Sequence, residues 1–390
     1  MVKYPVDWKI IQIKDIVLDI ADGPFGSNLK AVHYTNKHEA RIIQLSNLGE
    51  DGWKDENVKY TTYRHAKKIS RSIVPQNNVI MAKMMPAGRT IICPNNENMY
   101  VLSSDVIRIQ LNDKLVNKIF FVFSTKSHFF LNQLNSEIQG STRNRTSISK
   151  IKKNSILLPS LQEQQAIADT LSTFDTYISN LTELIEKKKA IREGALEDLV
   201  SGKTRLEGFG GEWKKGRLLD FTKIKRGKRV VRSQLYTTHK KETFPVYQNS
   251  LEPLGYFNDY NCRRNSVFVI AAGNAGDIGF SNENFWAADD CYSFEHTDNV
   301  SQKFLLYLLL SRQQEISAQT RRTSIPRLSR DILENLLVML PKQNEQQAIV
   351  NTLTAMDDEI RNLETELDKM KQIREGAMDD LLTGRIRLPL

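Results

Sequence analysis

Few residues in this 390-residue chain have the types and spacing that catalysis requires. The stretch "SGKT" at 201–204 imitates the end of the phosphate-binding loop GxxxxGK[ST]. That motif needs a glycine at position 197, where this chain has Glu197, and the stretch stands at the end of a helical pattern instead of opening one. The later copy of the segment reads "TGRI" and lacks the Lys-Thr pair. We therefore predict no nucleotide binding here.

The remaining titratable residues also lack catalytic spacing. "DDE" at 357–359 and the Glu186–Lys188 pair fall within helical patterns and predict solvated faces. No "NPPY"-like or "DPPY"-like stretch supports amino-methyltransferase activity. His33 and His38 have no further ligands at useful spacing, and the cysteines form no CxxC pair or disulfide framework. The sequence predicts no catalytic residue, no metal site and no cofactor in this chain.

Basic residues form the strongest functional pattern. The segment "KKGRLLDFTKIKRGKRVVR" at 214–232 holds nine Lys and Arg residues against one acid, Asp220. Alternating apolar and basic residues at 222–231 predict a strand or hairpin with a cationic outer face, and Gly227 would permit close approach of a phosphate. A solvated edge strand is the alternative. The candidate phosphate contacts are Lys225, Arg226, Lys228 and Arg229.

Two arginine-rich turns hold similar places ahead of two long helical patterns, "STRNRTSI" at 141–148 and "QTRRTSIPRL" at 319–328. An arginine there would suit a phosphate or a bidentate contact with guanine. The candidates are Arg143, Arg145, Arg321 and Arg322.

Polar loops after strand-like runs supply candidates for base contacts. "MAKMMPAGRT" follows "NNVI", and "AAGNAGDIGF" follows "NSVFVI". Amide side chains suit the edge of adenine, although a single residue of this kind is more often structural. The candidates are Lys83, Arg89 and Asn274 in these loops, and Gln248, Asn249 and Ser250 in a separate turn near aromatic residues.

An internal repeat organises the elements that must position these residues. "IREGALEDLVSGKTRL" at 191–206 returns as "IREGAMDDLLTGRIRL" at 373–388, and the ungapped match gives 25 identities in 51 positions. Repeats dictate architecture, and the segments before them also share a weaker plan. We predict four parts: a globular region at 1–155, a repeated helix at 156–206, a globular region at 207–337 and a repeated helix at 338–390.

Each repeat predicts a long helix with one apolar seam, because apolar residues recur at alternating steps of four and three. Ser160 with Glu163 predicts a capping box, and Gly202 and Gly384 predict helix ends. A helix from 160 to 201 would be about 60 Å long. Two matching seams predict an antiparallel coiled coil; two separate amphipathic helices are the alternative. The seam residues are Ile167, Leu171, Phe174, Ile178, Leu181 and Ile185, then Ile349, Leu353, Met356, Ile360, Leu363 and Leu367.

The net charge of +9 is unevenly distributed. Residues 1–155 carry +10 and 207–337 carry +4, whereas the two repeated segments carry −2 and −3. A polyanion would therefore bind the globular regions. The composition is that of a soluble protein, no apolar stretch approaches the roughly 20 residues of a membrane span, and scattered cysteines predict a cytoplasmic location with no membrane partner.

The twofold pattern of "LP", "EQQAI", "IREGA" and "LxxGxxRL" resembles the repeats of the specificity subunit of type I restriction–modification enzymes. The resemblance covers the whole chain, and "FPVYQNSLEPLGY" and "NSVFVIAAGNAGDIGF" resemble a target-recognition domain of that family. It implies an α+β fold in which two α/β target-recognition domains are separated by two long antiparallel helices.

The resemblance also implies a non-catalytic subunit that binds double-stranded DNA, each globular region reading one half of a split target. The helices would set the spacer and dock two modification (methyltransferase) subunits, which restriction (motor-nuclease) subunits then join. S-adenosylmethionine, ATP and Mg would belong to those partners. Because the globular regions differ in sequence, the target should be asymmetric. A coiled-coil scaffold that binds proteins without DNA specificity is the main alternative, and a self-sufficient enzyme is disfavoured by the missing motifs.

Overall fold

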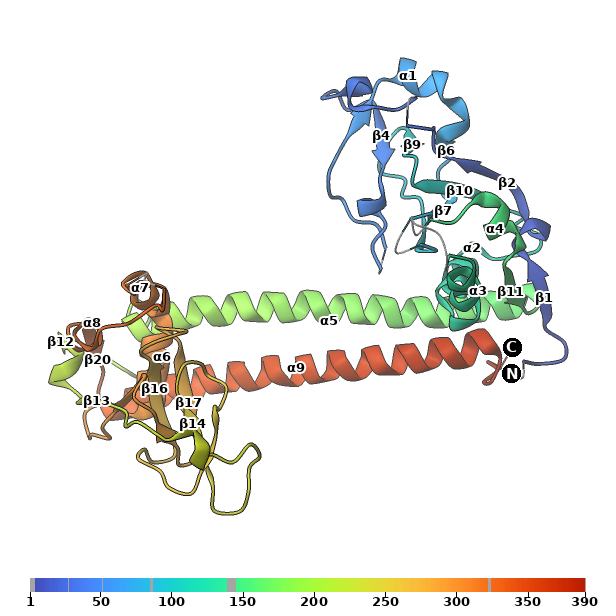
Figure 1. Cartoon of the computed structure of the whole chain (residues 1–390). Helices are drawn as coiled ribbons and strands as arrows, with labels where there is room; N and C mark the ends of the chain where they lie inside the picture. Colours follow the sequence, from blue (N-terminus) through green and yellow to red (C-terminus); the bar gives the residue numbers. More distant parts are fainter. Residues whose placement is uncertain are drawn as a thin grey trace. The chain divides into compact units, whose positions relative to one another are not determined.

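The computed structural model describes residues 4–26, 28–50, 52–84, 87–138, 145–321 and 324–389. The chain folds into two compact units, each combining one globular region with segments of both long helices (Figure 1). Unit 1 comprises Met1–Thr182 and Glu366–Leu390, and unit 2 comprises Glu183–Thr365. The division falls inside the long helices, so the predicted boundaries near 155, 206 and 337 stay predictions.

The described residues of unit 1 form three sheets: a two-stranded sheet, a four-stranded sheet of order β2-β10-β7-β8 and a five-stranded sheet of order β3-β5-β4-β9-β6. Most pairs are antiparallel, but β4 and β9 are parallel. The elements are β1 (Lys9–Gln12), β2 (Val17–Asp22), β3 (Tyr34–Thr35), β4 (Ala40–Ile43), β5 (Tyr60–Thr61), α1 (Tyr63–Lys68), β6 (Ile73–Val74), β7 (Val79–Ala82), β8 (Thr90–Ile92), β9 (Tyr100–Leu102), β10 (Val106–Leu111), α2 (Lys118–Lys126), α3 (His128–Ile138), α4 (Ile148–Lys153), β11 (Ser155–Leu158) and α5 (Leu161–Ser201).

Unit 2 repeats this plan with a two-stranded sheet, a four-stranded sheet of order β13-β19-β16-β17 and a three-stranded sheet of order β15-β14-β18. Strands β14 and β18 are parallel, as β4 and β9 are in unit 1. The elements are β12 (Lys214–Arg217), β13 (Ile224–Arg226), β14 (Phe244–Tyr247), β15 (Gly255–Phe257), β16 (Ser266–Ile270), β17 (Ile278–Ser281), β18 (Trp286–Ala287), β19 (Cys291–Phe294), α6 (Gln302–Ser311), α7 (Gln313–Ala318), α8 (Arg330–Glu334), β20 (Leu337–Leu340) and α9 (Gln343–Thr383).

The strand-like runs that precede the polar loops are strands, as predicted. All residues of β7 and β16 are buried, which accounts for their continuous apolar character. The predicted strand, turn and apolar helix appear as β10 with α2 and as β19 with α6. Both helices have a side-chain N-cap, Asn117 for α2 and Ser301 for α6.

Helices α5 and α9 are continuous over 41 residues each, close to the predicted bounds. Gly202 and Gly384 have φ angles of +75° and +71°, the left-handed conformation that ends a helix. The capping box is only half correct. The Ser160 hydroxyl accepts a hydrogen bond from the Glu163 backbone N–H at 3.2 Å, but the Glu163 carboxylate accepts from Trp8 and Arg387 instead of reaching back.

The two long helices run antiparallel in each unit, because the residue numbers of the contacting α9 residues fall as those of α5 rise. In unit 2, Arg192 Nε lies 2.7 Å from an Asp357 oxygen, and Lys188 pairs with Glu359. In unit 1, Arg374 Nε lies 2.8 Å from an Asp175 oxygen. Asp357 and Arg374 stand 182 positions after Asp175 and Arg192, so the same ion pair recurs in both units with the helices exchanged.

The ends of the predicted seam belong to the cores of the units. Ile167 and Leu171 pack with the α2 and α3 side chains of unit 1, and Ile349 and Leu353 occupy the same place in unit 2. Leu381 and Leu382 of α9 join the first core, and Leu199 and Val200 of α5 join the second. The start of one long helix and the end of the other therefore complete each core.

Truncation of a seam residue inside a core should destabilise unit 1. Leu171 is fully buried, so Leu171→Ala should lower the free energy of unfolding by about 2–5 kcal/mol through lost burial and a residual cavity. Leu161→Ala is the matched control on the same helix, because Leu161 is 43% exposed. Urea unfolding followed by tryptophan fluorescence measures both variants; equal effects would contradict the packing described.

Candidate nucleic-acid interface

The candidate residues of unit 2 gather at one end of its four-stranded sheet. Strands β13 and β16 both run antiparallel to β19, so both end where β19 begins. Backbone hydrogen bonds hold this end together: Gly227 N–H donates to Cys291 at 2.9 Å, and Ala271 N–H donates to Asp290 at 2.7 Å. Four segments therefore meet at this end of the sheet, which we call the unit 2 edge: 226–229, 247–250, 271–277 and 287–290.

The predicted amide side chains come together at this edge. Gln248 and Asn249 both donate to Asp290 Oδ2, at 3.4 and 3.3 Å. The Asn274 backbone N–H donates to the Asn249 carbonyl at 2.9 Å, and the Asn274 side chain is exposed. Ser250 instead donates to the Glu252 carbonyl inside its own turn. Gln248, Asn249 and Asn274 therefore form one polar cluster, linked by the shared Asp290 carboxylate and by the backbone bond from Asn274 to Asn249. The sequence did not connect Asn274 with the other two.

The four cations of the predicted basic strand have different surroundings. Lys225 lies 2.5 Å from Glu295, and this hydrogen bond lowers the pKa of the Glu295 carboxyl. Arg226 Nε donates to the Asp289 carbonyl at 2.8 Å. Lys228 and Arg229 are exposed and form no ion pair within the described part of the chain. The last two are the cations most available to a phosphate.

The prediction for this segment was wrong in two respects. Only Ile224–Arg226 form a strand, which is an outer strand of the sheet, and residues 227–231 are irregular. Gly227 is required by its own fold, because a Cβ there would lie 2.0 Å from the Ala288 carbonyl oxygen. Its close approach is to the chain entering β19 and not to a ligand.

Each arginine-rich turn reaches the corresponding end of the four-stranded sheet in its own unit, but the alignment of the two turns needs correction. Arg327 forms a β-bridge with Ala272, and Arg145 of unit 1 forms the corresponding bridge with Met84. Arg145 therefore matches Arg327, which the sequence interpretation missed, and not Arg321 or its neighbour. Arg321 and Arg327 are exposed and pair through their backbones, with a 2.9 Å bond. Arg143 and Arg322 lie outside the described residues.

Two candidates in unit 1 are tied into the fold. Lys83 is buried, and its ammonium contacts Asp22. Arg89 donates to the Leu48 carbonyl at 2.8 Å and pairs with Glu50 at 3.2 Å. Both side chains hold loops together, which argues against the predicted base contacts. The sequence could not reveal these ties, because the partners are 61 and about 40 residues away.

Arg145 has a mixed environment in unit 1. Its guanidinium donates to the Ser104 carbonyl at 2.6 Å, and it lies 3.8 Å from Asp105. The side chain is still 39% exposed. Arg145 therefore remains a candidate contact at the edge of unit 1, held in place by the loop before β10.

Gln44 is a further residue that the sequence interpretation missed. Ser103 N–H donates to Ile43, and Ala288 N–H donates to Tyr247, both at 2.9 Å, next to the parallel strand pairs of the two units. Gln44 therefore occupies the place of Gln248. The shared Gln in "RIIQLS" and "FPVYQNS" was the available signal.

The described residues contain no group of His, Cys, Asp and Glu side chains arranged to hold a metal ion. Burial raises the pKa of the Cys93 thiol to about 12, so it stays protonated at neutral pH and is a poor nucleophile. No helix in the described part of the chain combines the length and apolar character needed to cross a membrane.

Comparison with known proteins gives consistent results. The family model described as the type I restriction modification DNA specificity domain matches residues 5–191 and 210–372. The type I restriction enzyme MjaVIII specificity subunit of Methanocaldococcus jannaschii is 24% identical, covering 99% of this chain and 94% of its own. A putative type I specificity subunit of Mycoplasma genitalium is 25% identical over 42% of this chain and 43% of its own.

Solved structures show the same fold. The crystal structure of the type I restriction–modification system S subunit from M. genitalium matches with a TM-score of 0.63 at 18% identity, covering 98% of this chain and 97% of its own. The HsdS subunit from Thermoanaerobacter tengcongensis matches with a TM-score of 0.54 at 17% identity, covering 98% of both chains.

A side chain at position 227 should disrupt the edge that gathers the candidate residues. Gly227→Ala places a Cβ against the carbonyls of Ala287 and Ala288, so we expect a loss of stability of about 1–3 kcal/mol. Gly210→Ala is the control, because a Cβ there meets no atom within 4 Å. Thermal unfolding of the two variants measures the difference; an unchanged midpoint for Gly227→Ala would contradict the close approach.

Proposed function

The chain belongs to the type I restriction–modification DNA specificity family, and we propose that it is the non-catalytic subunit that selects the DNA target of such a complex. Each unit reads one half of a bipartite duplex site. The observation that carries the proposal is the edge of the unit 2 sheet, where three amide residues lie near two exposed cations that have no ion pair among the described residues. This combination suits DNA, because amides recognise base edges and cations bind phosphates.

In unit 2 we assign Lys228 and Arg229 to phosphates and the cluster of Gln248, Asn249 and Asn274 to base edges. The amides can donate to and accept from adenine once they exchange Asp290 for the base. In unit 1, Gln44 occupies the place of Gln248, and Arg145 occupies the place of Arg327. The next residue differs, because Leu45 stands in unit 1 where unit 2 has Asn249. The two half-sites should therefore differ and the target should be asymmetric.

We propose that α5 and α9 form an antiparallel coiled coil that sets the spacer between the half-sites. The seam residues between the cores, from Ile178 to Ile185 and from Ile360 to Leu367, would line it. The ion pairs Arg192–Asp357 and Arg374–Asp175 support a pseudo-twofold arrangement, since each is the image of the other in the repeat.

Such a surface would dock two modification subunits, each meeting the same residues. Restriction subunits would then join, and S-adenosylmethionine, ATP and Mg would be bound by these partners. A protein-binding scaffold remains the alternative function; it predicts no sequence preference among DNA duplexes and little dependence on salt.

The phosphate assignment predicts a change in salt dependence. Removal of two phosphate contacts in Lys228→Met with Arg229→Met should make the slope of log affinity against log salt shallower by about 2, since each contact releases about 0.9 counterion. The measurement is fluorescence anisotropy with target duplex, using the chain assembled with its modification subunits. Lys369→Met with Lys371→Met, two exposed cations of α9, is the control. Equal slopes in all three proteins would refute the assignment.

The division of reading between the units predicts the result of an exchange. Replacement of residues 1–155 by the corresponding region of another family member should change one half of the methylated motif and leave the other half and the spacer unchanged. Sequencing of methylated motifs in DNA from cells that carry the chimera measures this. A change in both halves would show that the units do not read independently.

A further inference from the structure

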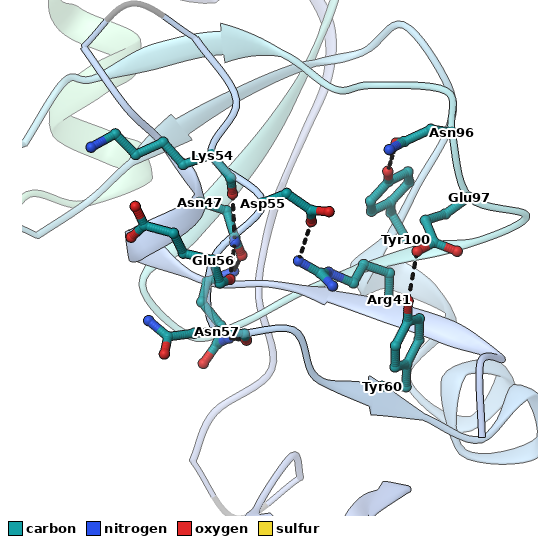
Figure 2. Close-up of polar contacts among 11 residues, drawn as sticks. Arg41, Asn47, Lys54, Asp55, Glu56, Asn57, Tyr60, Asn96, Glu97 and Tyr100 are labelled. Atoms are coloured by element: carbon teal, nitrogen blue, oxygen red, sulfur yellow. Dashed lines mark hydrogen bonds and ion pairs between the residues drawn. The ribbon is translucent and has the colours of Figure 1, made fainter. Parts of the chain in front are cut away.

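Arg41 on β4 has an unusual environment for an arginine. Its side chain is 2% exposed, and a buried guanidinium is costly unless charged or hydrogen-bonding groups surround it. One carboxylate, that of Asp55, lies 2.8 Å from Nη2, and Nε has no hydrogen-bond partner within the described residues. The rings of Trp53 and Tyr60 lie 6.0 and 5.6 Å from the guanidinium carbon. Figure 2 shows the side chain directed from the strand toward Asp55.

The partner of Arg41 belongs to the loop that begins at Gln44. This loop is closed by its own polar contacts (Figure 2): Asn47 Nδ2 donates to the carbonyls of Lys54 and Glu56 at 2.9 and 2.7 Å. Gln44 Nε2 donates to the Asn57 carbonyl at 2.6 Å. These hydrogen bonds join the two ends of the loop, 44–47 and 54–57, and the Arg41–Asp55 ion pair is a tie between the loop and the sheet.

The Asp55 end of this tie is open to solvent. The Asp55 side chain is 67% exposed, whereas the aromatic wall around the guanidinium is fixed: the Tyr60 hydroxyl donates to Glu97 at 2.8 Å. Because Asp55 is exposed, water screens its attraction to the guanidinium, so the ion pair itself adds little net stability. Its environment fits a role in orienting the loop better than a role in holding the core together.

Unit 2 lacks this arrangement. Because Ile43 matches Tyr247 in the backbone pairing, Arg41 falls at the place of Pro245. Pro245 has no charged group to offer to the following turn. The tie is therefore specific to unit 1, and its effect on recognition should be confined to one half-site.

We propose that Arg41 is a positioning residue for DNA recognition by unit 1. Through Asp55 it sets the orientation of the loop at 44–57 and, with it, of the Gln44 side chain at the base edges. Arg41 itself, being buried, does not touch DNA. The inference rests on the proposed reading of one half-site by each unit.

The test uses the chain assembled with its modification subunits and a target whose two half-sites have been identified by sequencing of methylated motifs. Arg41→Met keeps the length of the side chain and removes its charge, and Asp55→Asn weakens the same tie from its exposed end. Lys54→Met is the matched control, an exposed side chain in the same loop. The quantity measured is the ratio of affinities for the matched duplex and for single-base mismatches, determined separately in each half-site.

We expect Arg41→Met to lower this ratio at least tenfold in the half-site read by unit 1, Asp55→Asn to lower it less, and neither to change the other half-site. Lys54→Met should leave both ratios unchanged. An equal fall in both half-sites would show a general loss of structure, and unchanged ratios in both would show that the tie is dispensable; either result overturns the inference. If the unmodified complex prefers no sequence in either half-site, the proposed function fails instead.

Discussion

Each core depends on helix segments from both repeats. In unit 1, Leu171 near the start of α5 and Leu381 near the end of α9 are both buried in one cluster, and Leu353 and Leu199 have the same relation in unit 2. Neither globular region can bury its apolar surface with the helix that directly follows it alone. The antiparallel return of α9 along α5 is therefore a condition for two folded units, because burial of this apolar surface is the main force that stabilises them.

The polar contacts at the helix ends explain which residues the two repeats share. Glu163 and Glu345 are both buried, and each pairs with an arginine from the end of the other helix, Arg387 and Arg205. Removal of the arginine would leave a buried carboxylate without its ion-pair partner, at a cost of about 3–5 kcal/mol. The adjacent Gln164 accepts from the Asn117 N–H, and the Gln346 of α9 accepts from the N–H of the α6 cap. The Glu and first Gln of "EQQ" and the Arg of "RL" therefore make equivalent contacts in both units.

Features that depend on neighbouring residues could be predicted from the sequence, whereas contacts between residues far apart in the chain could not. The predicted helix from 160 to 201 agrees with α5 at Leu161–Ser201, and the glycines at 202 and 384 marked the ends of both long helices. The Glu163 carboxylate was assigned to a local cap, because nothing nearby indicates that Arg387 lies 224 positions away. Lys83 is a predicted base contact that the structure buries against Asp22, a partner 61 positions away that the sequence could not indicate. Of the candidate interface, the residue types were predictable, but their convergence on Asp290 required the sheet register.

Equivalent turns follow β4 in unit 1 and β14 in unit 2, but different side-chain contacts support them. The turn after β4 is tied by Arg41 and Asp55, whereas the turn after β14 follows Tyr247, which stacks on Phe268 with ring centroids 4.4 Å apart. The backbone hydrogen bonds that align the turns are the same in both units and do not depend on side-chain identity. The side chains that support or form the reading edge of such a sheet can therefore be substituted while the strand register stays fixed. Two halves with one plan can therefore diverge in what they recognise, whereas the helix contacts that complete both cores cannot change independently.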